Sequence, residues 1–102
     1  LGNGGGGLSG PAIHPVAVRA VHDVAAARPE VPVVGVGGVT DAETAAELVV
    51  AGACAVQVGT ATFADPRAPG RVAADLVGWC RRHGIHPFDQ LIGAIHGPPV
   101  HR

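Results

Sequence analysis

Two short apolar runs, each closed by glycine and followed by a helical pattern, set the strongest constraint on how this chain can fold. Residues 31–36 (VPVVGV) end at a glycine pair, and residues 53–58 (ACAVQV) end at Gly59-Thr60. Runs this short, bounded by turn residues and without polar alternation, are typical of strands that are buried on both faces. The sequence therefore predicts two strands of a parallel sheet.

Helical periodicity surrounds both runs. Residues 16–28, 42–51 and 71–83 repeat apolar side chains at the three- and four-residue steps of an amphipathic helix. We expect Thr40 or Asp41 to cap the second helix. The residues expected to end the three helices are Pro29, Gly52 and Gly84. The predicted apolar stripes comprise Val18, Val21, Val24, Ala25, Ala45, Leu48, Val49, Val72, Leu76, Trp79 and Cys80.

Helices that alternate with short strands form the βα units of a parallel sheet, whose ligands gather at the carboxyl ends of the strands. A closed (β/α)8 barrel needs roughly 250 residues, and two units in a chain of 102 residues cannot close one. The chain begins at Leu1, contains no Met and opens on glycine-rich sequence, so we interpret its N-terminus as a cut. We expect the C-terminal part of a larger α/β protein, with residues 1–15 as a loop.

Charge and composition exclude several function classes. The formal net charge is −1 and no cationic stripe is present, so binding to nucleic acid or to an anionic membrane is not expected. No apolar run approaches the ~18 residues of a membrane span. Two cysteines without motif spacing, and no signal peptide, predict a reducing cytoplasm. Cys54, in a predicted strand, and Cys80, on a helix stripe, are expected to act as small buried hydrophobic residues.

The glycine turns after the two predicted strands are the main candidate for a binding site. Gly37-Gly38 and Gly59-Thr60 each lead from a strand to the start of a helix. Glycine lets backbone N–H groups approach an anion closely, and a helix N-terminus adds partial positive charge, so the two turns together can cradle a phosphate. A phosphate site after strands 7 and 8 of a barrel needs such a pair of turns. The alternative is that the glycines only make tight connections between strand and helix.

Other sequence features give weaker evidence of function than the glycine turns do. Residues 5–10 (GGGLSG) formally match the dinucleotide fingerprint G-x-G-x-x-G, but no strand precedes them and Pro11 follows at once. His83 and His86 have H-x-x-H spacing, but Gly84 breaks the helix between them, so we do not expect a zinc site. The chain contains no Lys, so Schiff-base chemistry cannot be located in it.

Three stretches of the sequence resemble one family closely. They are residues 6–21 (GGLSGPAIHPVAVRAV), residues 31–69, and the helix that runs to His83-Gly84-Ile85. They are similar to the C-terminal third of dihydroorotate dehydrogenases, specifically to the catalytic subunits of the NAD-linked class 1B enzymes. The GGLSGPAI motif, together with GVGG and VGTATFADP, is far more specific than a generic glycine turn.

The resemblance implies the C-terminal βα units of a TIM (β/α)8 barrel, incomplete in this chain. It implies an FMN-binding protein that oxidises dihydroorotate to orotate in pyrimidine (UMP) biosynthesis. By the same resemblance, Gly10 contacts FMN, while Gly37, Gly38, Gly59 and Thr60 hold its phosphate. Electrons would leave through an iron–sulfur and FAD subunit to NAD, and the full-length enzyme is expected to be an oligomer.

The resemblance also implies what this chain lacks. The family's catalytic cysteine, the lysine beneath the flavin and the asparagines that bind orotate belong to upstream segments. We therefore expect no catalytic residue here and no turnover by residues 1–102 alone. Residues 1–85 would be part of an FMN-binding barrel domain, and residues 86–102 a C-terminal extension that forms either one short helix or a frayed tail.

One departure from the family pattern is His14, where members commonly have Lys; we expect it to be a surface residue of the loop. Two alternatives remain open. One is a truncated, non-catalytic βα module that still binds phosphate ligands or pairs with other barrel fragments. The other is a different FMN-dependent TIM-barrel oxidoreductase, against which the GGLSGPAI loop argues.

Overall fold

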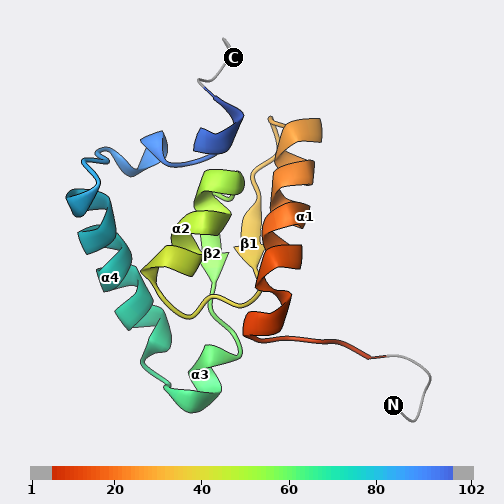
Figure 1. Ribbon diagram of the computed structural model, residues 1–102, viewed down its shortest axis with the longest axis vertical. Helices are drawn as coiled ribbons and strands as arrows, with labels where there is room; N and C mark the ends of the chain where they lie inside the picture. The colour runs from red at the N-terminus through yellow and green to blue at the C-terminus, as the bar shows by residue number, and fades with distance from the viewer. Residues whose placement is uncertain (1–5, 98–102) are drawn as a thin grey trace.

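The computed structural model describes residues 6–97 (Figure 1). Residues 1–5 of the predicted loop and residues 98–102 of the predicted extension lie outside the described residues. The elements are the 3-10 helix η1 (Pro11–Ile13), α1 (His14–Ala27), β1 (Val34–Val36), α2 (Ala42–Ala51), β2 (Ala55–Gln57), α3 (Ala61–Ala64), α4 (Ala68–Arg82), and the 3-10 helices η2 (Phe88–Gln90) and η3 (Ala94–His96).

The two strands form a parallel sheet in which Gly35 lies opposite Val56. α2 connects the strands and lies between α1 and α4, in contact with both (Figure 1). The predicted alternation of helices with parallel strands is therefore confirmed. No helix among the described residues is long and apolar enough to cross a bilayer.

The core consists of two clusters that meet on α2. One joins α2 to α1 and the sheet around Leu48, and the other joins α2 to α4 around Val49. The predicted stripe of α2 is confirmed, because Ala45, Leu48 and Val49 are all buried. Val24 is an exception on α1, since it is exposed rather than packed.

The prediction that both strands are buried on two faces is wrong for the described residues. Val34 and Val36 are 49% and 53% exposed, while Gly35 between them is buried. The reason is that helices cover only the face toward which Gly35 points, against Leu48. Cys54, which was expected to be buried with the second strand, is exposed for the same reason.

The connection between β2 and α4 holds an element that the sequence did not indicate. α3 is a single turn, and α4 begins at Ala68, earlier than the predicted residue 71. Asp65 sets this start: its side chain accepts a hydrogen bond from the N–H of Arg67 at 3.0 Å, and its carbonyl accepts one from Ala68 at 2.9 Å. A proline-rich stretch that resembles a plain turn thus forms the first turn of a helix.

Residues 86–97 form neither of the two expected structures. Two short 3-10 helices replace the single helix, because Gly93 has a left-handed backbone conformation with φ of 68°. The N–H of Gly93 donates to the carbonyl of Val49 at 2.8 Å, and Nε2 of His96 donates to that of Ala51 at 2.7 Å. Leu91 is buried in the second core cluster, so this segment is packed onto α2 rather than frayed.

Candidate functional site

Both strands end at the same edge of the sheet, because they are parallel. The turn after β1 contains Gly37-Gly38, and the segment after β2 contains Gly59-Thr60. η1 and α3 also lie at this edge, toward which the strand arrows point in Figure 1. Gly10, the residue before η1, therefore lies at the same edge as the two turns.

Three loops that are distant in the sequence meet here. A Cβ atom placed on Gly38 would lie 3.0 Å from the carbonyl oxygen of Gly10. One placed on Gly10 would lie 3.7 Å from Cγ2 of Thr60. The structure thus brings together the three segments that carry the predicted site residues.

Gly37 and Gly38 are required by the way β1 approaches α1. Their φ angles are 139° and 67°, and a Cβ atom on them would lie 2.6 Å from Cβ of Ala17 and 2.7 Å from Cβ of His14, respectively. The alternative of a tight connection explains these two glycines without a ligand. Gly59 differs, because its φ is not positive and a Cβ there would meet no atom within 4 Å.

Unused backbone donors are present on both turns. Among residues 6–97, the N–H groups of Gly38 and Gly59 donate to no other group. Unpaired backbone N–H groups favour an anion, because each adds partial positive charge and a directed hydrogen bond. The edge that carries Gly10, Gly38 and Gly59 therefore has two free donors of the kind that an anion needs.

The N-terminus of α2 contributes less to binding an anion than its position after the first turn indicates. The side chain of Asp41 accepts from the N–H of Thr44 at 2.8 Å, and Oγ1 of Thr44 accepts from the N–H of Asp41 at 3.1 Å. This reciprocal capping box confirms the expected cap. The bond from Thr44 lowers the pKa of Asp41, and the charge of Arg71 lowers it further. A carboxylate already occupies the positive end of α2, so the donors for an anion come from the turns.

His14 corrects a sequence-based expectation. It is the first residue of α1 and is buried, not a surface residue of the loop. Its Nδ1–H donates to the carbonyl oxygen of Gly37 at 2.8 Å. This histidine therefore lies directly beneath the first glycine turn.

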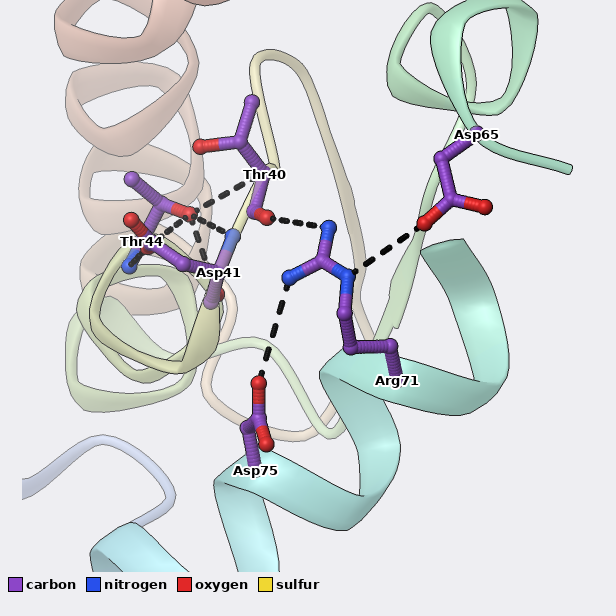
Figure 2. Close-up of polar contacts among 6 residues, drawn as sticks. All are labelled: Thr40, Asp41, Thr44, Asp65, Arg71 and Asp75. Carbon is purple, nitrogen blue, oxygen red and sulfur yellow. Dashed lines mark hydrogen bonds and ion pairs between the residues drawn. The ribbon is translucent and has the colours of Figure 1, made fainter. Parts of the chain in front are cut away.

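Arg71 connects the segments that follow the two turns, and Figure 2 shows its contacts. Its Nη2 donates to the carbonyl oxygen of Thr40 at 3.1 Å, next to the first turn. Its Nε lies 3.6 Å from Oδ2 of Asp65, in the segment after β2, and its Nη1 lies 3.9 Å from Oδ2 of Asp75. The sequence offered only the spacing of Arg71 and Asp75 as a signal, because the other partners are distant in the chain.

The remaining polar groups lie away from this edge. Within residues 6–97, no three His, Cys, Asp or Glu side chains are grouped to hold a metal ion. The ring of His83 stacks on Trp79 at a centroid distance of 4.0 Å. Cys54 precedes β2 at the opposite edge, and Cys80 is buried in the helix layer.

A groove on the helix layer is also separate from the glycine turns. It has a volume of about 990 Å³ and lies between α1, α2 and α4 on the helix layer. Val18, Val50 and Trp79 line it together with both acidic and basic side chains. None of the residues Gly10, Gly38 or Gly59 borders this groove, so the groove and the glycine turns are two separate places on the molecule.

Comparison with known families identifies the sequence pattern. Residues 1–78 match the family model for dihydroorotate dehydrogenase. The chain is 52% identical over 95 residues to a protein from Solibacter usitatus described as a dihydroorotate dehydrogenase A (fumarate). It is 50% identical over 97 residues to the dihydroorotate dehydrogenase B (NAD(+)) catalytic subunit of Trichlorobacter lovleyi. These alignments cover 93% and 95% of this chain but 31% and 32% of the relatives, so the chain spans about a third of their length.

Solved structures give the same result. The chain matches the dihydroorotate dehydrogenase of Eimeria tenella in complex with ferulenol, with a TM-score of 0.85 and 28% sequence identity. The ligand-free form of that enzyme matches with a TM-score of 0.84. Each match covers more than nine-tenths of this chain and 26% of the other. The two βα units are therefore part of a TIM barrel that is incomplete in this chain.

Proposed function

Because the chain belongs to the dihydroorotate dehydrogenase family, we propose that it is the C-terminal segment of an FMN-dependent enzyme that oxidises dihydroorotate to orotate in pyrimidine biosynthesis. The 50% identical relatives named as catalytic subunits of the NAD-linked enzyme support this assignment. The share of those relatives that the chain covers supports a segment rather than a whole barrel. Residues 1–85 would belong to the barrel domain, and residues 86–102 would form an extension of it.

The proposed role of this segment is to hold the phosphate of FMN. Gly37, Gly38, Gly59 and Thr60 would hold the phosphate, and Gly10 would contact FMN beside them. The observation that carries this proposal is the convergence of the Gly10 loop and the two glycine turns at the carboxyl edge of the sheet, where the N–H groups of Gly38 and Gly59 have no acceptor in residues 6–97. When bound, FMN supplies the redox chemistry, and the protein supplies binding and orientation.

The proposed partners follow from the relatives. The substrate would be dihydroorotate, and in the NAD-linked form electrons would pass through an iron–sulfur and FAD subunit to NAD. The similarity to the fumarate-named protein supports fumarate as the other acceptor. We place the enzyme in the cytoplasm as an oligomer, and we expect no orotate formation when the full chain is mixed with FMN and dihydroorotate.

A comparison of FMN with riboflavin tests the phosphate site. The two ligands share the flavin ring and ribityl chain and differ only in the phosphate, so the full chain should bind FMN at least about tenfold more tightly, the effect of one charge-assisted hydrogen bond. Flavin fluorescence quenching measures both dissociation constants. Equal affinities for the two ligands would refute the proposal.

A matched pair of glycine substitutions locates the site. Gly59→Ala adds a methyl group where no atom lies within 4 Å, and Gly70→Ala does the same at the start of α4. Gly59→Ala should weaken FMN binding because the methyl group occupies the space of the phosphate, while Gly70→Ala should not. Equal effects of the two substitutions would contradict the location.

A further inference from the structure

His14 is a buried polar side chain directly beneath the candidate site. The residue is 7% exposed, and its Nδ1 lies 2.8 Å from the carbonyl oxygen of Gly37. A carbonyl oxygen can only accept, so Nδ1 carries the proton. Nε2 is then left without a hydrogen-bond partner among the described residues, 3.7 Å from Oε1 of Glu47.

Packing alone does not account for this histidine. A buried nitrogen without a partner is destabilising, and an aliphatic side chain of similar volume would fill the space without that cost. What the ring provides, and an aliphatic side chain does not, is the single hydrogen bond to Gly37. The function of His14 should therefore depend on that bond.

The bond determines how the next peptide group is oriented. The peptide between Gly37 and Gly38 is trans, as is every described peptide bond except that between His86 and Pro87. In a trans peptide the C=O and N–H groups point in opposite directions. Because the oxygen of Gly37 points at His14, the N–H of Gly38 points away from α1, and it donates to no group in residues 6–97.

We propose that His14 is a positioning residue, which fixes the carbonyl of Gly37 and thereby aims the N–H of Gly38 at the phosphate. This inference rests on the proposed function, since it assumes that a phosphate binds at the glycine turns. Rotation of that peptide would turn a carbonyl oxygen toward the anion in place of the donor. The two glycines tolerate such rotation because they lack side chains, so an external anchor is needed to hold one orientation.

Three substitutions separate the hydrogen bond from the bulk of the ring. His14→Leu keeps much of the volume and removes the donor. His14→Asn keeps an N–H near the position of Nδ1, whereas His14→Gln places its amide further out, near Nε2. His86→Leu removes an exposed histidine and serves as the matched control.

The readouts are the affinities of the full chain for FMN and riboflavin, and the chemical shift of the Gly38 amide during titration with inorganic phosphate. We expect His14→Leu and His14→Gln to weaken FMN binding about tenfold, the loss of one good hydrogen bond, and to leave riboflavin binding unchanged. His14→Asn and His86→Leu should retain FMN binding. The Gly38 amide should move with phosphate in the wild-type chain, in His14→Asn and in His86→Leu, but not in His14→Leu or His14→Gln.

The outcomes distinguish this inference from the proposed function. If the wild-type chain does not prefer FMN to riboflavin, the phosphate site itself is wrong. If it does, and His14→Leu has the same preference, the positioning role alone is wrong. Two results would overturn the positioning role in favour of a packing role. One is an equal loss of FMN affinity in His14→Asn and His14→Gln, and the other is a loss of riboflavin affinity in His14→Leu as large as its loss of FMN affinity. Should His14→Leu not fold, the Asn and Gln pair, both of which keep a polar side chain, decides the question.

Discussion

Gly37 and Gly38 serve both the packing of β1 against α1 and the candidate binding site. Their positive φ angles and the absence of Cβ atoms let the end of β1 lie against Ala17 and His14. The same conformation leaves the N–H of Gly38 without a partner in the described part of the chain. Packing and ligand binding therefore cannot be separated at Gly38 by substitution alone, but they can at Gly59, where packing imposes no constraint.

Stability measurements should show this difference. Gly38→Ala should lower the free energy of unfolding by more than about 1 kcal/mol, because a left-handed conformation alone costs an L-residue that much and the new methyl group would also contact His14. Gly59→Ala should change it by less than about 0.5 kcal/mol, as is usual for unconstrained surface positions. Urea unfolding followed by circular dichroism measures both, and a Gly38→Ala chain as stable as wild type would contradict the packing.

Asp41 gives the chain a defined acid sensitivity. Its folded pKa lies below the ordinary value of 3.8, chiefly because the N–H of Thr44 donates to it. A lowered folded pKa means that the carboxylate stabilises the fold above pH 3.8 and that this contribution disappears as the pH falls through the lower folded value. Asp41→Asn keeps a capping oxygen without the charge. Its unfolding midpoint should therefore fall less steeply than that of wild type from pH 5 to pH 2, and parallel curves would exclude the effect.

At the scale of elements, the sequence predicts structure where local signals define both ends. α2 has the predicted bounds because Asp41 and Thr44 form its capping box and Gly52 ends it with a φ of 138°. α3 and the segment after Pro87 lack such signals, and packing against other elements decides their form. His14 was misplaced for a related reason: Pro15 marked a helix start, but η1 begins the helical path earlier.

In the candidate site, too, some features can be predicted from local sequence and others depend on tertiary contacts. The glycine turns are visible in the sequence because each follows an apolar run. Arg71 and His14 are not, because their partners Thr40, Asp65 and Gly37 become neighbours only in the folded chain. Local pattern thus finds the loops that would contact a phosphate, and tertiary contact alone reveals the side chains that hold those loops in place.

Substitution of Arg71 tests whether α4 holds together the segments that follow the two glycine turns. Arg71→Met keeps most of the aliphatic stem but removes the bond to Thr40 and the ion pair with Asp65. Because the pair is partly exposed, the loss of stability should stay within about 1 kcal/mol, while FMN affinity should fall several-fold as the two turns lose their fixed separation. Arg67→Met is the control, because it removes a more exposed ion pair to the same Asp65 but no bond to Thr40. Unchanged FMN affinity in Arg71→Met would show that the link is not needed.

At the scale of the whole molecule, the described structure has one covered and one open face of its sheet. Val34 and Val36 lie on the open face, and Leu8 and Phe63 are further exposed apolar residues, at 74% and 92%. Open strands with exposed apolar side chains favour association with another chain. In a complete barrel, this face would be covered by the other strands.

The open face predicts concentration-dependent association of the full chain. Threonine at both Val34 and Val36 should shift the chain toward monomer, since it keeps the branched shape while replacing a methyl group with a hydroxyl. The matched control replaces Val24 and Val77, which are exposed to a similar extent on helices. Sedimentation velocity over a range of concentrations compares the two. If both pairs of substitutions have the same effect, the association does not involve the sheet face.

If the three glycine loops form one FMN site, an amide NMR titration of the full chain with FMN should locate it. We expect the largest shifts on Gly10, Gly37, Gly38, Gly59 and Thr60, and riboflavin should not reproduce those of Gly37, Gly38, Gly59 and Thr60. Shifts concentrated instead in the groove between α1, α2 and α4, around Trp79, would contradict it. So would a titration in which FMN and riboflavin move the same amides equally.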